Sequence, residues 1–524
     1  MRPGEVTHRG AVPVDRHGRI GVGDIIAGVS VALVVVPQSL AYAELAGLPA
    51  HLGLYAAALP SLVAAFAASS RYLQTGPVAM TALLTFGALS QLAMPGSPGY
   101  IGLAALLAVV VGVVRLGFGL AKAGFITFSM SHPVVLGFST GAVVLIIASQ
   151  AAVATGVTDA PAELLPRLWD VITHPGSWNG AAVALSVATV LIIEVCRRLN
   201  PLIPGVLIAL LVGLAVGGLT DYGAALLGEV QAGLPPLSLA LPWSDLPSLL
   251  LPGAIIAGVG MAEPTAIART LAAQDRERWD PNRELVSQGV ANLAAGLSGG
   301  FPVGGSFSRS SINKLAGAHT RWSGAVTGLT VLAFTPFAGL LRSLPRAVLG
   351  AIVISAVVRL VRIPDMIRLI RVTWGQAVIA WVTFAATLTL APRIDLAVLI
   401  GVGLAALVHL YRESSRLVVR TEFTAPVLRV TPVGVLFYGS APFLADALNE
   451  KLAEHRGATE IRLNIERLGR IDHSGMMALQ DFAAEVRGAG LTISVERVPR
   501  VFAGIWERSG GLGPESRTTP RAGI

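Results

Sequence analysis

The residue with the clearest chemical potential in this sequence is Arg309, because it lies in a largely apolar region beside helix breakers. The segment Gly305-Ser306-Phe307-Ser308-Arg309 comes fifty residues after the pentapeptide Ile-Ile-Ala-Gly-Val at 255–259. The same pentapeptide occurs at 25–29, and a second breaker-rich segment, Thr75-Gly76-Pro77-Val78, follows it at the same distance. The offset between the copies is 230 residues, which indicates an internal repeat with interrupted apolar segments at matching positions.

Both segments are suited to begin a helix in the middle of an apolar region. Pro is well placed in a first helical turn. A helix start exposes unpaired N–H groups and about half a positive charge, so two starts that face each other form a cradle for an anion. Arg309 adds a full positive charge to that cradle. The alternatives are that Arg309 reaches the membrane surface and binds nothing, and that Gly76 and Pro77 form a plain kink or loop.

The composition places these segments in a polytopic membrane protein. The chain has 524 residues, of which 53% are hydrophobic and 13% charged, whereas a soluble protein carries about 25% charged residues. A span needs about 20 apolar residues, or fewer if its helix is broken. The pattern predicts fourteen spans, near 24–43, 52–68, 76–94, 100–121, 133–155, 179–196, 202–218, 247–263, 285–300, 306–316, 323–341, 345–361, 373–391 and 393–411.

Halving these spans gives seven per repeat, and an odd number per copy forces the two copies into opposite orientations. The net charge of +8 is interpreted as loop charge on the cytoplasmic side, because basic loops stay inside. Fourteen spans with both ends inside place the basic clusters there, whereas Arg342 and Arg346 go against the pattern. Cys196 is the only cysteine, so neither an intrachain disulfide nor a cysteine metal cluster is expected.

The composition changes after Tyr411, where short apolar runs alternate with amphipathic stretches. This pattern predicts a compact α/β unit of roughly 90 residues. Its expected strands are 427–430, 435–438, 460–465 and 491–495, and its expected helices are 443–455, 474–486 and 501–508. The predicted organisation is a cytoplasmic N-terminal segment (1–20), a transmembrane transport domain (21–411), a linker (412–424), the α/β domain (425–510) and a disordered tail (511–524).

Several ordered motifs resemble the SulP family of anion transporters, also called the sulfate permease family. They are Val36-Pro37-Gln38-Ser39-Leu40-Ala41-Tyr42-Ala43 in the first span, Asp280-Pro281-Asn282-Arg283-Glu284-Leu285, and the run from Gly305 through Arg309 to Gly317-Ala318-His319-Thr320. The C-terminal unit resembles a STAS domain, with Ile471-Asp472-His473-Ser474-Gly475 at its strand-to-helix turn. The resemblance implies two inverted seven-span repeats divided into a core and a gate domain, and a homodimer.

The resemblance also implies a substrate site. The arginine of the tenth span lines the anion site in that family, which assigns this role to Arg309. The remaining substrate-binding residues are then Gln38, Tyr42, Thr75, Gly76, Pro77, Val78, Ser306, Phe307 and Ser308. Gln38 and Tyr42 have an alternative role in packing or hydrogen bonding between helices.

Two acidic residues are candidates for ion coupling. Glu263 precedes Pro264 in the eighth span, where the family has an acidic residue facing the site. A buried carboxylate can carry a proton through a cycle, although Glu263 can instead pair with Arg309 or cap a helix. Glu44 ends the first span, where it is either a coupling residue or an exposed carboxylate at the outer edge. Proton coupling is favoured over sodium, because no second acid follows within two turns of Glu263 and a sodium site would want several hard oxygens.

In soluble relatives of the C-terminal domain, a serine at the position of Ser474 is phosphorylated, which makes Ser474 a candidate regulatory site. The alternative is that Asp472, His473 or Ser474 caps the helix that begins there. No metal or cofactor is expected.

The resemblance implies a secondary active transporter of small inorganic or carboxylate anions that works by alternating access in the plasma membrane, and the residues around Glu263 favour proton coupling. Sulfate is the family default, with bicarbonate or a dicarboxylate as options. The alternatives are a nucleobase–cation symporter on the same fold, which would not need Arg309, and a membrane anion sensor that signals through its STAS domain. An enzyme is not expected, because the sequence holds no zinc-spaced His/Cys set and no nucleotide loop.

Overall fold

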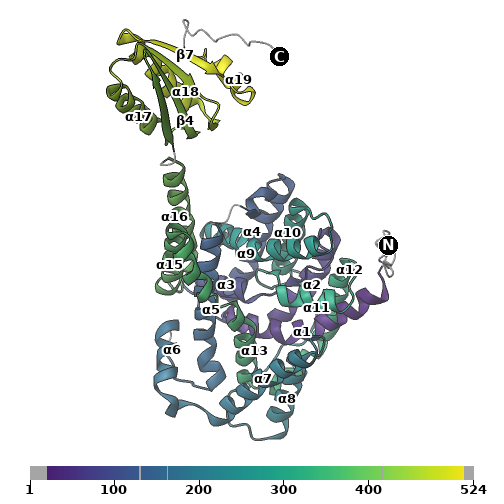
Figure 1. Cartoon of the computed structure of the whole chain (residues 1–524). Coiled ribbons are helices and arrows are strands. Elements are labelled where there is room, and N and C mark those ends of the chain that lie inside the picture. The colour runs from purple at the N-terminus through teal and green to yellow at the C-terminus, as the bar shows by residue number, and fades with distance from the viewer. Residues whose placement is uncertain (1–19, 129–130, 162, 415–416, 513–524) are drawn as a thin grey trace, which may run out of the picture. The chain divides into compact units, whose positions relative to one another are not determined.

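The computed structural model describes residues 20–128, 131–161, 163–414 and 417–512 (Figure 1). The chain divides into two compact units, Met1–Val402 and Gly403–Ile524. The N-terminal segment predicted for 1–20 lies outside the described residues except for Ile20. Of the tail predicted for 511–524, only Gly511 and Leu512 are described, and Leu512 is buried in the C-terminal unit.

The first unit is helical, and a helix coincides with each of the fourteen predicted spans. Among the described residues, eight helical segments are long and apolar enough to cross a membrane, and three apolar helices are shorter. The helices at the predicted spans are α1 (Val22–Leu45), α2 (His51–Ala67), α3 (Ala79–Leu89), α4 (Pro98–Leu120), α5 (His132–Thr155), α7 (Gly180–Leu199), α8 (Gly205–Leu219), α9 (Leu246–Gln274), α10 (Pro281–Leu297), α11 (Phe307–Leu315), α12 (Trp322–Phe334) with η4 (Thr335–Ser343), α13 (Arg346–Val357) with η5 (Val358–Leu360), α15 (Trp374–Thr389) and α16 (Ile394–Ser414).

Several short helices lie between the spans. Two of them, α6 (Leu164–Thr173) and α14 (Ile363–Val372), were not predicted. They occupy equivalent places in the two repeats, each between the fifth and the sixth span of its copy. The other short helices are η1 (Gly124–Phe128), η2 (Pro175–Ser177) and η3 (Trp243–Asp245).

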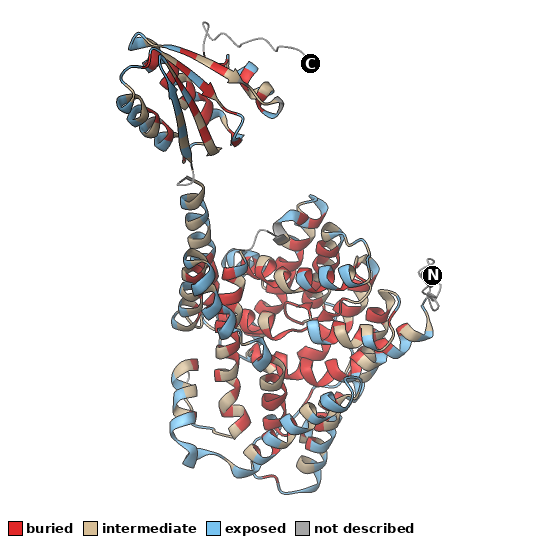
Figure 2. Cartoon of the chain, in the orientation of Figure 1, coloured by how far each residue is buried: buried red, intermediate tan, exposed pale blue. Residues whose placement is uncertain are grey.

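The helices pack in two groups, which are the core and the gate. In the core, α10 packs along α4 and α2, and α12 packs along α2 and α1. In the gate, α5 packs on α13 and α15, and α7 packs on α8 and α13. Small residues allow the close approach within the core: a Cβ on Gly289 would lie 2.7 Å from the backbone nitrogen of Leu116, so α10 can meet α4 only with glycine there. Figure 2 shows that buried residues fill the interior of this unit, whereas α6, α7 and α8 are largely exposed.

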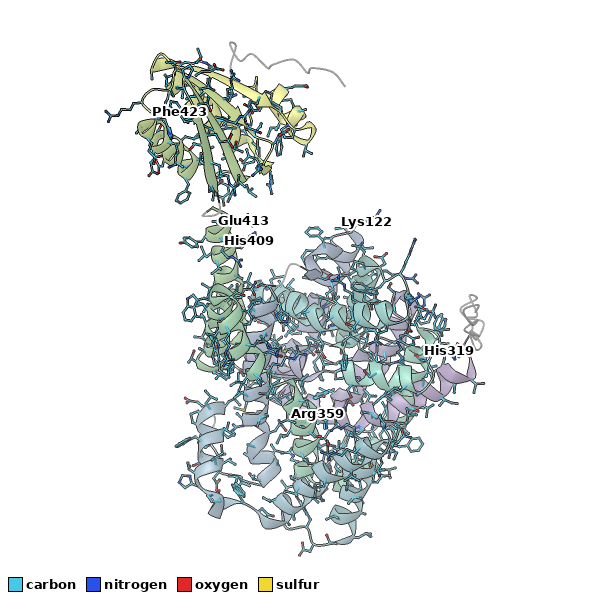
Figure 3. The ribbon with its side chains drawn as sticks, in the orientation of Figure 1. Lys122, His319, Arg359, His409, Glu413 and Phe423 are labelled. Carbon is cyan, nitrogen blue, oxygen red and sulfur yellow. The ribbon has the colours of Figure 1, made fainter. Side chains whose placement is uncertain are left out.

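The start of α1 is fixed to the second repeat by a buried carboxylate. Asp24 accepts hydrogen bonds from the backbone N–H groups of His319 and Thr320, both at 2.8 Å. His319 lies beside the first turns of α1 in Figure 3. The loop between α11 and α12 is therefore attached to the first helix of the chain.

The second unit is an α/β fold with its own hydrophobic core. Its sheet has the order β3-β4-β5-β7, with β6 also paired to β4. β3 runs antiparallel to β4, and the other pairs are parallel. The elements are β3 (Val418–Thr424), β4 (Val427–Leu436), α17 (Ala441–Glu454), β5 (Glu460–Asn464), β6 (Leu468–Ile471), α18 (His473–Gly488), β7 (Thr492–Arg497) and α19 (Arg500–Arg508).

The three predicted helices of this unit are confirmed, but the predicted strand pair at 427–430 and 435–438 is wrong. A single strand, β4, covers this region. Pro432 cannot donate a hydrogen bond. It lies between the part of β4 that pairs with β5 and the part that pairs with β6, so one strand can run through a residue that is typical of turns. The range 412–424, predicted as a linker, holds the end of α16 and β3, an edge strand whose residues are mostly exposed.

Candidate functional site

The two breaker-rich segments lie against each other in the structure. Thr75–Gly76 forms β1 and Gly304–Gly305 forms β2, and the two short strands pair antiparallel. The register sets Thr75 opposite Gly305, which is its equivalent under the 230-residue offset. Helices α3 and α11 begin directly after these strands. The two helix starts are thus brought together at the point where the repeats meet.

Arg309 lies in the first turns of α11 and is 1% exposed. Its Nη1 donates to the carbonyl of Pro77 at 2.8 Å, which links it to the opposite helix start. Its Nη2 lies 3.4 Å from the position that a Cβ on Gly76 would take. Among the described residues, neither its Nε nor its Nη2 has a hydrogen-bond partner. The alternative in which Arg309 reaches the membrane surface is excluded by this burial.

Neither helix start is capped by its own N-cap side chain, since Val78 and Ser306 make no such hydrogen bond. The first N–H of α11 lies near the carboxylate of Glu263 in α9, because Glu263 interacts with the backbone of Phe307. Glu263 also interacts electrostatically with Arg309. This geometry agrees with the alternative in which Glu263 caps a helix, whereas no ion pair within 4.0 Å joins Glu263 to Arg309 in the part of the chain that the structure describes.

Polar side chains support the strand pair from behind. Gln288 donates from Nε2 to the hydroxyl of Thr75 at 2.7 Å, and Ser61 donates to the carbonyl of Thr75 at 2.6 Å. The backbone N–H of Gln74 donates to the Ser310 hydroxyl at 2.9 Å. β1 is therefore held by α2, α10 and α11, and these contacts fix the start of α3 relative to Arg309.

Gln38 and Tyr42 lie in α1, and both are buried. Tyr42 interacts electrostatically with Arg309 and Glu263, so it belongs to the same cluster. The Oε1 atom of Gln38 has no hydrogen-bond partner among the described residues. Thr75, Gly76, Pro77 and Val78 are buried as well, whereas Phe307 and Ser308 are exposed, Phe307 by 57%.

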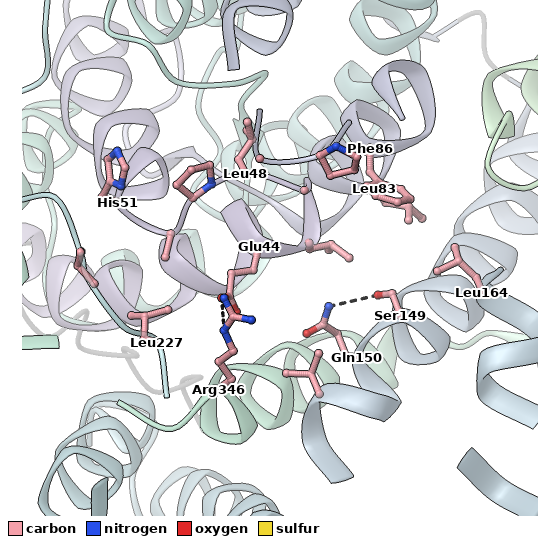
Figure 4. A pocket seen from close by; sticks show the side chains of 18 of the residues that line it. Glu44, Leu48, His51, Leu83, Phe86, Ser149, Gln150, Leu164, Leu227 and Arg346 are labelled. Atoms are coloured by element: carbon pink, nitrogen blue, oxygen red, sulfur yellow. Dashed lines mark hydrogen bonds and ion pairs between the residues drawn. The ribbon is translucent and has the colours of Figure 1, made fainter. Parts of the chain in front are cut away.

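Glu44 lies outside this cluster. It ends α1 and forms an ion pair with Arg346 at the start of α13, with 3.3 Å between Oε1 and Nε. The pair lines a cavity of about 590 Å³ between core and gate (Figure 4), together with Gln150 of α5. Arg346 goes against the predicted charge pattern of the loops, and its partner Glu44 accounts for its position.

Sequence reasoning missed a second buried arginine, Arg115 in α4. It is 0% exposed and donates to the backbone carbonyls of Ile256, Ala257 and Val303, at 3.2, 3.2 and 2.9 Å. It holds α9 and the segment before β2 in place. The sequence does indicate this residue, because an arginine inside a predicted span needs a hydrogen-bond or charge partner. Gln288 and Ser61 gave no such signal, because polar residues of these types are common in helices.

In the C-terminal unit, Asp472 caps α18 by accepting a hydrogen bond from the backbone N–H of Gly475 at 2.9 Å. Ser474 follows in the first turn and is partly exposed. The capping role considered for this turn thus falls to Asp472, and modification of Ser474 stays a prediction.

Comparisons with known proteins agree with this architecture. A probable sulfate transporter of Mycobacterium tuberculosis is 34% identical over 377 residues, which cover 70% of this chain and 67% of that protein. The structure of murine solute carrier 26 family member A9, an anion transporter in the inward-facing state, matches with a TM-score of 0.86 at 20% identity, over 93% of this chain and 87% of that one. The transmembrane domain of a cyanobacterial bicarbonate transporter matches with a TM-score of 0.62 at 24% identity, over 73% of this chain and 96% of that one.

The structural matches share the fold at low identity. The model of the sulfate permease family matches residues 22–383, a range that includes β1, β2 and Arg309. This chain is a multi-pass membrane protein that belongs to the sulfate permease family of anion transporters.

Proposed function

We propose that the chain is a secondary transporter of small anions that binds its substrate between the starts of α3 and α11 and works by alternating access. The observation that carries the proposal is the state of Arg309. A buried guanidinium with two nitrogens that lack a partner among the described residues is costly in a membrane. Native proteins rarely leave such groups unpaired. An anion at this position would accept hydrogen bonds from both nitrogens.

The free helix start of α3 supports the same position. The first N–H groups of a helix lack partners within the helix, and α3 has no N-cap side chain that satisfies them. The strand pair sets these groups beside Arg309. Backbone N–H groups together with one guanidinium suit an oxyanion such as sulfate, bicarbonate or a carboxylate.

Glu263 supplies a route for proton coupling. Its carboxylate lies at the start of α11 and beside Arg309, so in its charged form it competes with an anionic substrate for both groups. Protonation of Glu263 removes this competition and also removes the charge repulsion between its carboxylate and the anionic substrate. Binding of the anion and of a proton to Glu263 would therefore favour each other, which is the requirement for symport.

Sulfate is the proposed substrate, supported by the name of the mycobacterial relative. Bicarbonate is the second candidate, supported by the structural match to a bicarbonate transporter. The distribution of basic residues supports a cytoplasmic location of both chain ends. We further propose that the C-terminal unit is a STAS domain that follows a linker, and that the protein is a homodimer of the plasma membrane.

The direct test is uptake by the purified protein in liposomes. Radiolabelled sulfate, bicarbonate, a dicarboxylate and uracil are each offered with and without inward proton and sodium gradients. The expected result is uptake of at least one of the anions, faster with an inward proton gradient. Arg309→Gln should lose this uptake. Its matched control is Arg342→Gln, because Arg342 is exposed in η4.

Three results would contradict the proposal. Uptake of uracil alone would identify a nucleobase symporter. Anion binding without uptake would identify a sensor. Stimulation by sodium in place of protons would leave anion transport standing and remove the role assigned to Glu263. Chemical cross-linking of the protein in liposomes tests the homodimer separately.

A further inference from the structure

Helix α14 has two faces of opposite character. Met366 is buried, and α14 packs on α15 and α5. Ile363, Ile367 and Ile370 lie on the same side of the helix at spacings of three and four residues, yet each is more than a third exposed. This apolar face is thus only partly covered by the described protein. Arg368 and Arg371, which are both exposed, lie on the side of the helix opposite to Met366, and Arg371 borders the isoleucine face.

The helix is too short to cross a bilayer. It has 10 residues, which extend about 15 Å, whereas the hydrocarbon core is about 30 Å thick. A short helix with an apolar face and a basic face is suited to lie in the membrane interface. Trp374, the first residue of α15, lies two residues after the end of α14 and is 71% exposed, in agreement with the enrichment of tryptophan at that depth.

The equivalent helix of the first repeat, α6, provides an internal comparison. It also turns one side to the protein, through Leu164 and Val171, and exposes Trp169 by 70%. Its charges are balanced, since it holds Arg167 and Asp170. The two helices lie on opposite membrane faces, because the repeats are inverted. Of these two helices, only α14 carries a net positive charge. The excess charge is therefore found on one membrane face of the gate.

The basic surface continues beyond α14. Arg359 (labelled in Figure 3) and Arg362 directly precede it, and the end of α7 adds Arg197 and Arg198. Glu194 pairs with Arg197, Arg198 and Arg359 and so joins α7 to this surface. Among the described residues, no ion pair or side-chain hydrogen bond is found for Arg362, Arg368 or Arg371. This surface therefore contains six arginines and only two carboxylates among its described residues, Glu194 and Asp365.

We propose that this surface, formed by α14 and by Arg197, Arg198, Arg359 and Arg362, binds the headgroups of anionic phospholipids and holds the gate to one leaflet. The exposed isoleucines would insert among the acyl chains while the arginines pair with lipid phosphates. The rule that basic loops stay inside explains which side of the membrane these arginines occupy. It does not explain why they lie on a helix whose isoleucines are left exposed.

The test measures lipid binding and is independent of transport. The purified full-length protein is titrated with phosphatidylglycerol and with phosphatidylcholine, and binding constants are obtained by native mass spectrometry. A basic residue near the membrane surface contributes about 1 kcal/mol, which is about fivefold in affinity. The double variant Arg368→Gln/Arg371→Gln should therefore lose up to about 25-fold of its preference for phosphatidylglycerol.

Two matched variants separate the possible causes. Arg368→Lys/Arg371→Lys keeps the charge and should keep most of the preference. Arg276→Gln/Arg278→Gln removes the same charge from the loop between α9 and α10 and should leave the preference unchanged. The single variant Arg371→Gln, expected to lose about fivefold, serves if the double variant does not fold. An unchanged preference in the glutamine variants, or an equal loss in the loop control, overturns the proposal.

Discussion

Replacement of Arg309 by glutamine should nearly eliminate anion binding while the protein stays folded. Two nitrogens of the guanidinium, Nε and Nη2, are free to bind an anion. A hydrogen bond to a charged group contributes about 1.5–3 kcal/mol, so two of them contribute about 3–6 kcal/mol. At 1.4 kcal/mol per tenfold change, the affinity should fall by roughly 10²- to 10⁴-fold.

The same substitution should cost little stability. It removes the hydrogen bond from Nη1 to the carbonyl of Pro77, but it also removes a buried charge that has few partners. Arg309→Lys keeps the charge and loses the planar fork, so an intermediate affinity is expected. Sulfate binding is measured by isothermal titration calorimetry, and folding by gel filtration and thermal unfolding in detergent.

If folded Arg309→Gln binds sulfate within about threefold of the wild type, Arg309 does not bind the anion, because the loss of two charged hydrogen bonds cannot have so small an effect. Arg342→Gln provides the control, since it removes an exposed arginine outside the site and should leave the affinity unchanged. Equal losses in both variants would show a general effect of charge.

Three further predictions concern the acidic residues. Glu263→Gln, which mimics a protonated carboxyl, should retain anion binding and make uptake insensitive to the proton gradient; an intact gradient response would remove Glu263 from coupling. Glu44→Gln should change uptake less than about fivefold, because a partly exposed ion pair contributes at most about 1 kcal/mol. A double-mutant cycle with Arg346→Gln measures the interaction free energy of the ion pair. Complete loss of uptake in Glu44→Gln would favour a coupling role for Glu44. Asp472→Ala should lower the unfolding free energy of the protein by about 1 kcal/mol through loss of a helix cap, whereas Ser474→Ala should not, as chemical denaturation of the two variants would show.

The sequence alone predicted a helix at each of the fourteen spans of the membrane unit and the meeting of the two helix starts. The reason is that apolar length and helix breakers are local properties. The repeated pentapeptide then gave the correspondence between Thr75 and Gly305, and these residues are paired in the structure. The roles assigned to Gln38 and Tyr42 came from the family resemblance and stay predictions.

Other features depended on packing and were not predictable from local sequence. Arg115 is satisfied by three backbone carbonyls of α9 and of the segment before β2, a set of partners that no local pattern reveals. β4 was predicted as two strands, but one strand runs through Pro432, because its pairing partner changes from β5 to β6 at that point. The amphipathic helix α14 was missed because its arginines interrupt the apolar pattern between two spans.

The binding of an anion between the two helix starts is tested most directly by a structure of the full-length protein with selenate, whose anomalous scattering locates the anion. The expected result is one anion between the starts of α3 and α11, within hydrogen-bond distance of Nε or Nη2 of Arg309. Selenate bound beside Arg346 in the cavity of Figure 4, with none near Arg309, would contradict the account.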